Sequence, residues 1–160
     1  MDHIAAKAFS LIKNRIMRKK LLRTGSTLGM LAVLIGAMGA HSLEGLLSSE
    51  GMETFETGVR YHFYHTFAIL ICTVLIHFGK KSLLWYAGLA FAIGIGLFSG
   101  SLYLLSFRET IALPTQWLGP ITPVGGLFFV AGWMLLFASS FQKPEKVKTR
   151  KRRNYEEVPV

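Results

Sequence analysis

The chain has 160 residues, of which 51% are hydrophobic, and its formal net charge at pH 7 is +9. Together with a mean hydropathy of +0.41, this composition argues against a soluble globular domain and predicts a single membrane-embedded unit. The excess charge does not indicate nucleic-acid binding, because most Lys and Arg residues lie at the two ends of the chain, and the single cysteine, Cys72, excludes an intrachain disulfide.

The first 24 residues form a basic segment with seven Lys and Arg side chains. Ile4, Ala8, Ile12 and Ile16 recur at a spacing of four residues, opposite Lys7 and Lys13 among others. This modest amphipathic pattern predicts a cytoplasmic helix that lies in the plane of the inner leaflet. A cleaved signal sequence is not expected, since the basic stretch is too long for the start of one.

Four later stretches are long and apolar enough to cross a bilayer as helices, which takes about 20 residues. They are residues 25–43, 61–79, 84–106 and 118–141. The expected fold is therefore all-α: an integral membrane protein with four transmembrane helices in a compact bundle over residues 25–141. Residues 142–160 are basic, lack an apolar period, and are predicted to be a disordered cytoplasmic tail held near anionic lipids by charge.

The distribution of positive charge predicts how the chain is threaded. Seven Lys and Arg residues precede residue 25, Lys80 and Lys81 follow the second stretch, and seven more follow residue 141, whereas the other two connections hold only Arg60 and Arg108. Because positive charge is retained on the cytoplasmic side, both termini are expected there, in a multi-pass protein of the bacterial inner (plasma) membrane.

Small residues at every fourth position predict where the helices pack closely, since lipid is as apolar as leucine and close contact must drive association. The third stretch supplies Gly88, Ala92, Gly96 and Gly100, and the first has a similar run that begins at Gly25 and Gly29.

The fourth stretch opens with GPITPVGG, in which Pro120 and Pro123 restrict the backbone while Gly125 and Gly126 loosen it. Proline costs little in a first helical turn, so an ordinary helix start at the interface is one interpretation. The other is a partly unwound segment whose free N–H groups bind an anion.

The second stretch has a polar side. At 100° per residue, His62, His65 and Thr66 fall on one half of the helix with Ala68, Ile69, Cys72 and Thr73, while bulky apolar residues fill the other half. The polar half is expected to face the bundle interior, which makes His62, His65 and Thr66 a candidate polar or proton-handling site. Three roles are open for the histidines: hydrogen bonds between helices, handling of a proton or solute, or ligation of a metal or haem.

Metal ligation would need a third ligand, and His41, at the outer end of the first stretch, is expected at the headgroups instead. No metal and no cofactor is therefore predicted. Glu56 and Arg60, four residues apart with the acid first, are expected to form an interfacial ion pair on the other side of the same helix.

Four ordered blocks carry a resemblance to a known family: GAMGAHSLE (36–44), FETGVRYHFYH (55–65), LFSGSLYLL (97–105) and LGPITPVGGLFFVAGW (118–133). The chain resembles the YgdD-like family of small inner-membrane proteins of unknown function, to which the eukaryotic transmembrane protein 256 is related. The resemblance implies a four-span fold and brings no reaction, ligand or catalytic residue.

No enzyme signature occurs, because the chain lacks a nucleophile elbow, a phosphate-binding loop, an HExxH motif and a CxxC pair. We therefore expect no enzymatic activity. The leading interpretation is a structural or accessory bundle that packs with itself or with a larger membrane complex. The alternative is a small transporter or proton-coupled solute-binding protein that uses His62 and His65.

Overall fold

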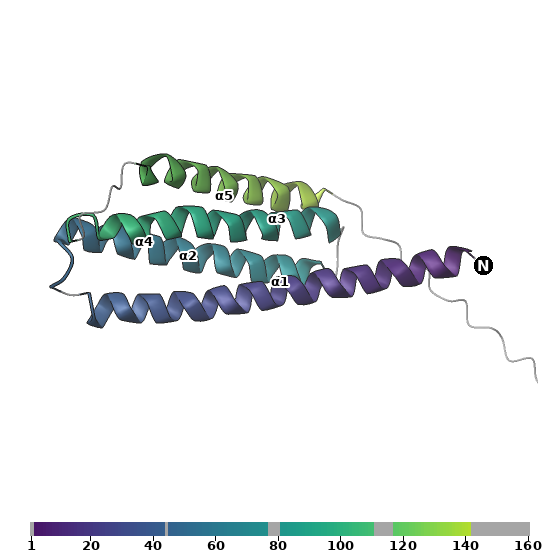
Figure 1. The fold of residues 1–160 in the computed structure, drawn as a ribbon. Coiled ribbons are helices and arrows are strands. Elements are labelled where there is room, and N and C mark those ends of the chain that lie inside the picture. Colours follow the sequence, from purple (N-terminus) through teal and green to yellow (C-terminus); the bar gives the residue numbers. More distant parts are fainter. Residues whose placement is uncertain (1, 44, 77–80, 111–116, 142–160) are drawn as a thin grey trace, which may run out of the picture.

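The computed structural model of the protein describes residues 2–43, 45–76, 81–110 and 117–141. Within these ranges every regular element is a helix (Figure 1). The long helices are α1 (Asp2–His41), α2 (Ser49–Leu75), α3 (Lys81–Gly94) and α5 (Leu118–Ser140), and α3 continues through a π turn, η1 (Ile95–Ser99), into α4 (Gly100–Ser106).

Three helical stretches have the length and hydropathy of membrane spans: Leu11–His41, Ser82–Ser106 and Leu118–Ser140, with mean hydropathies of 1.5, 1.8 and 1.9. The described part of α2 is not among them, and its last 18 residues include Arg60, His62 and His65. The all-α class and the membrane environment are thus confirmed, and the bilayer is the medium that these apolar helices require.

The helices lie side by side, and successive long helices run in opposite directions (Figure 1). α2 lies between α1 and α3, whereas α5 packs along α3, η1 and α4. α1 and α5 consequently occupy opposite edges of the assembly. The N-terminal part of α1 extends well beyond the ends of the other helices.

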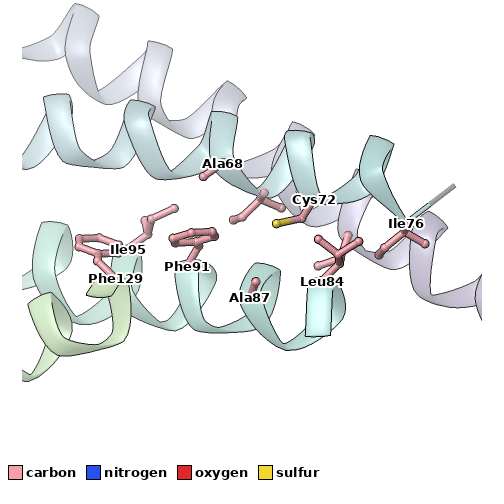
Figure 2. Close-up of a cluster of buried hydrophobic side chains, with 10 residues drawn as sticks. Ala68, Cys72, Ile76, Leu84, Ala87, Phe91, Ile95 and Phe129 are labelled. Carbon is pink, nitrogen blue, oxygen red and sulfur yellow. The ribbon is translucent and has the colours of Figure 1, made fainter. Parts of the chain in front are cut away.

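The main core lies between α2 and α3, towards the end of the bundle where α3 begins (Figure 2). α2 contributes Ala68, Ile69, Cys72 and Ile76 to it, and α3 with η1 contributes Leu84, Ala87, Phe91 and Ile95; Leu21 of α1 and Phe129 of α5 complete it. A smaller cluster at the other end is formed by Leu43, Leu47 and Phe55, against which Tyr103 and Phe107 pack.

Two expected boundaries differ from the structure. α1 is continuous through residues 24 and 25, so the predicted in-plane segment of residues 1–24 is the first part of one 40-residue helix. α2 begins at Ser49, well before residue 61, because the Ser48 hydroxyl accepts a hydrogen bond from the Gly51 N–H and Phe55 is buried in the smaller cluster. The tail of residues 142–160 and Lys80 lie outside the described residues.

The π turn sets which residues of the third span face α2. A π turn contains an additional residue, which changes the angular register of the helix that follows it. Phe91, Ile95 and Ser99 follow one another at intervals of four residues, and all three are buried. The next residue in this series is Tyr103, which is hydrogen-bonded to His62. Without this shift in register, Ser99 and Tyr103 would turn away from the histidine face of α2.

Candidate functional site

The polar arc of α2 faces the inside of the bundle, as its spacing predicts. His62 is 3% exposed, His65 5% and Thr66 2%, and Ala68, Ile69, Cys72 and Thr73 of the same arc are also buried. The opposite side of α2 exposes Phe67, Ile71 and Val74. The sequence pattern therefore placed both imidazoles correctly between helices.

His65 is held by both of its ring nitrogens. Its Nδ1 lies 2.8 Å from the carbonyl oxygen of Tyr61, and the indole Nε1–H of Trp133 on α5 donates to its Nε2 over 3.3 Å. An indole N–H can only donate, so Nε2 must accept and the single proton of a neutral ring must sit on Nδ1, where it is donated to Tyr61. The geometry thus selects one neutral tautomer.

Stacking fixes the plane of the same ring. His65 and Phe129 of α5 are parallel, with ring centroids 3.4 Å apart and an interplanar angle of 4°. The Trp133 ring meets the imidazole edge-on. The ring centroid of Phe91 on α3 lies 5.6 Å from that of His65. Since α5 otherwise packs along α3, η1 and α4, the contacts of Phe129 and Trp133 with His65 connect α5 to α2.

His62, one turn nearer the start of α2, reaches a different helix. Its Nδ1 lies 3.1 Å from the phenolic oxygen of Tyr103 on α4. Its buried Nε2 makes no hydrogen bond with a described residue. His62 therefore joins α2 to α4.

Two hydroxyl groups near His62 have no hydrogen-bond partner among the described residues. They belong to Thr66 on α2 and Ser99 in η1, and both are fully buried together with His62 Nε2. Thr66 lies one turn beyond His62, and Ser99 one turn before Tyr103. Because the two helices are antiparallel, the pairing of His62 with Tyr103 brings Thr66 and Ser99 to a common level. The Thr66 and Ser99 hydroxyls thus lie about one helical turn along the bundle from the His62–Tyr103 pair.

A metal site near His62 and His65 would need further His, Cys, Asp or Glu ligands. No group of three His, Cys, Asp or Glu side chains that could hold a metal occurs among the described residues. His41 is exposed at the end of α1, and Cys72 is buried in the main core.

The expected ion pair of Glu56 with Arg60 is not formed. Arg60 donates to the Thr57 hydroxyl over 3.0 Å instead, because that acceptor lies one turn back on the same exposed face. An ion pair at this end of the bundle joins Arg108, after α4, to Glu50 at the start of α2 over 2.6 Å. This ion pair connects the start of α2 with the segment after α4, which the sequence analysis assigned to two separate connections.

The proposed small-residue stripe of the third span packs only in its first half. Gly88 lies against Leu21 of α1, and Ala92 borders the main core. The prediction is wrong for Gly96 and Gly100, at which an added Cβ would meet nothing within 4 Å. A spacing of four drifts by about 40° per step on an α-helix, and the π turn then changes the register again.

Other glycines make the close contacts of α5. A Cβ at Gly94 would collide with the Phe129 ring, one at Gly125 with the Phe98 backbone, and one at Gly132 with the Phe91 ring. The proximity of the α5 backbone to α3 and η1 lets Phe129 and Trp133 reach His65. Sequence reasoning missed these aromatic partners, although Gly125, Phe129 and Gly132 share a helical face that could have marked them.

The start of α5 is an ordinary helix. Pro120 and Pro123 both lie inside a continuous helix from Leu118 to Ser140 rather than in an unwound segment. Gly125 is buried against η1. A Cβ added at Gly126 would lie 3.9 Å from the ring of Phe98. The hydroxyls of Thr122 and Ser101 are 2.7 Å apart and further join α5 to α4.

The regular elements of the described residues are all helices, and three helical stretches are apolar enough to span a membrane. His62 and His65 are buried between helices. These features define a polytopic α-helical membrane protein. Residues 35–126 match a family described as "Protein of unknown function (DUF423)", and the chain belongs to that family. The resemblance to YgdD-like proteins is thereby confirmed.

Several bacterial relatives share this core. The chain is 40% identical to the UPF0382 membrane protein SH2409 of Staphylococcus haemolyticus over 118 residues, which are 74% of this chain and 92% of the relative. It is 38% identical to the UPF0382 membrane protein YwdK of Bacillus subtilis (72% and 91% covered). It is 34% identical to the UPF0382 inner membrane protein YgdD of Escherichia coli (74% and 86% covered). No solved structure matches the chain.

Proposed function

We propose that the protein is a structural or accessory four-span bundle that packs with itself or with a larger membrane complex. The observation that carries this proposal is the use of both imidazoles as contacts between helices: His65 joins α2 to α5, and His62 joins α2 to α4. Such contacts stabilise helix packing in membranes, where no hydrophobic force drives association. We propose no catalytic role for any residue.

α2 is the fourth span in this proposal. It lies between two helices that are apolar enough to cross a bilayer, and its polar arc is covered by them. Its other side presents Phe67, Ile71 and Val74, which are 58%, 48% and 61% exposed and suited to contact with acyl chains. Its low mean hydropathy therefore reflects an inward polar face rather than a position outside the bilayer.

Charge supports an orientation with both termini in the cytoplasm. The starts of α1 and α3 and the end of α5 lie at one end of the bundle, and the parts of the sequence next to these helix ends are rich in Lys and Arg. Arg60 belongs to the first half of α2 and Arg108 follows α4, at helix ends that lie on the opposite side of the bundle. The positive-inside rule assigns the first end to the cytoplasm. The E. coli relative is named an inner membrane protein, which supports the same membrane for this chain.

The edges of the bundle supply the surface for packing with partners. α1 and α5 each expose a row of large apolar side chains, including Met30, Leu34 and Met38 on α1 and Leu127, Met134 and Phe137 on α5. In a lone bundle these rows would contact acyl chains. The same rows on a second copy or on a larger complex would extend the helix packing across the edge.

A purification from membranes in mild detergent tests this role. We expect the wild-type chain to copurify with a second copy of itself or with a stable complex, and His62→Gln/His65→Gln to lower abundance and assembly together. His41→Gln is the matched control, because His41 is an exposed histidine, and it should leave both unchanged. Recovery of the double variant at normal abundance and in the same assembly would contradict the proposal.

Proton-coupled binding of a small polar solute is the second candidate. It is favoured by the buried, unpartnered groups of His62, Thr66 and Ser99 beside a π turn, an element often found at functional sites. In this case the double histidine variant would remain folded and abundant but would lose a pH-dependent uptake measured in vesicles. An isolated bundle with unchanged uptake in the variant would exclude both candidates.

A further inference from the structure

A half-open groove of about 570 Å³ lies between the N-terminal half of α1 and the start of α3. We propose that it binds one anionic phospholipid, with the headgroup phosphate at Lys13 and Lys20 and an acyl chain along the neighbouring apolar side chains. The groove lies beyond the contact of Leu21 with Gly88, at the end where α1 projects past the other helices (Figure 1).

The two lysines supply the charge for a phosphate. Lys13 and Lys20 are seven residues apart, two helical turns, and therefore lie on one side of α1. Both are exposed, the described residues that line the groove include no acid, and neither lysine forms an ion pair with a described residue. A phosphate oxygen is a complementary group for the two ammonium groups.

The remaining walls are suited to an amphiphile rather than a soluble polyanion. Phe9, Ile12 and Ile16 line the groove from α1 and are 71%, 60% and 49% exposed. Trp85 and Tyr86 line it from α3, and such aromatic side chains favour the headgroup level of a bilayer. A nucleic acid would gain nothing from this apolar surface, whereas a phospholipid offers both a phosphate and a hydrocarbon chain.

The position of the groove explains what the lipid would do. The groove separates residues 9–20 of α1 from residues 82–86 of α3, so a bound lipid would fill the space between them and hold the extension of α1 against α3. The proposed orientation assigns this lipid to the cytoplasmic leaflet. The binding chemistry itself does not depend on that orientation or on the accessory role.

The test uses the purified full-length protein in detergent. Native mass spectrometry counts bound phosphatidylglycerol against phosphatidylcholine, and thermal unfolding is followed with each lipid added. The variants are Lys13→Gln/Lys20→Gln and the matched control Lys19→Gln/Arg23→Gln, which removes the same charge from exposed positions of the same helix outside the groove lining. All four side chains are exposed, so both variants should fold. The number of lipids bound to the wild type is a further measurement that does not depend on either variant.

We expect phosphatidylglycerol to bind and stabilise the wild type and the control, and its apparent affinity to fall about tenfold to thirtyfold in the groove variant. An equal loss in both variants would overturn the proposal in favour of general charge attraction, and no loss in either would exclude the groove. A stabilisation by inorganic phosphate equal to that by the lipid would also overturn it, because the acyl chain would then contribute nothing.

Discussion

Replacing Gly125 by alanine tests the close approach of α5 to η1, on which the contacts of His65 depend. A Cβ at this position would collide with the backbone nitrogen of Phe98 and lie 2.8 Å from both its Cα and its Cβ. Since two helix backbones cannot yield as a flexible side chain does, the helices must separate, at a cost of about 1–3 kcal/mol. The better helix propensity of alanine offsets about 0.5–1 kcal/mol of this cost.

The neighbouring position is the control. A Cβ at Gly126 would lie 3.9 Å from the ring of Phe98, an ordinary van der Waals contact, so Gly126→Ala should be neutral or slightly stabilising. The gain in helix propensity is common to both variants, so unfolding in mixed micelles, followed by far-ultraviolet circular dichroism, should show Gly125→Ala less stable than Gly126→Ala by about 1–3 kcal/mol. Equal stability of the two variants would refute the close contact and the placement of Phe129 against His65.

Three further substitutions test the buried polar groups. Trp133→Phe removes the indole donor to His65 and should cost about 0.6 kcal/mol in the free energy of unfolding, a loss that disappears in a His65→Asn background if the double-mutant cycle isolates this bond. Thr66→Val removes a hydroxyl with no described partner and should be neutral or stabilising, whereas Thr122→Val breaks the contact with Ser101 and should cost about 1 kcal/mol. A clear loss of stability in Thr66→Val would show that water or a ligand satisfies this hydroxyl.

Regular periodicity explains which parts of this fold were predictable. The third and fourth spans were expected at residues 84–106 and 118–141 and occur at Lys81–Ser106 and Leu118–Ser140. The buried arc of α2 followed from the angular positions of its residues, because a helix of constant pitch turns spacing directly into direction. His62 and His65 could therefore be placed between helices without knowledge of their neighbours.

The parts that failed depend on irregular geometry or on tertiary contacts. Gly96 and Gly100 share the spacing of Gly88, but the stripe drifts and the π turn at Ile95–Ser99 follows no sequence rule used in the prediction. The start of α2 at Ser49 was not predicted, because the acidic residues before residue 61 made this segment too polar to count as part of an apolar stretch. The packing of Phe55 in the smaller cluster supports the helix there. Arg108 and Glu50, 58 residues apart, meet only once the fold is known.

Single-cysteine labelling of intact cells measures the threading of the chain, the central claim of this account. In a Cys72→Ala background, Glu109→Cys places an exposed thiol after α4 and Ser82→Cys places one at the start of α3, at opposite ends of the third span. Four spans with cytoplasmic termini predict that a membrane-impermeant maleimide labels position 109 in intact cells and position 82 only after permeabilisation. Labelling of position 82 in intact cells, or of both positions alike, would contradict the threading.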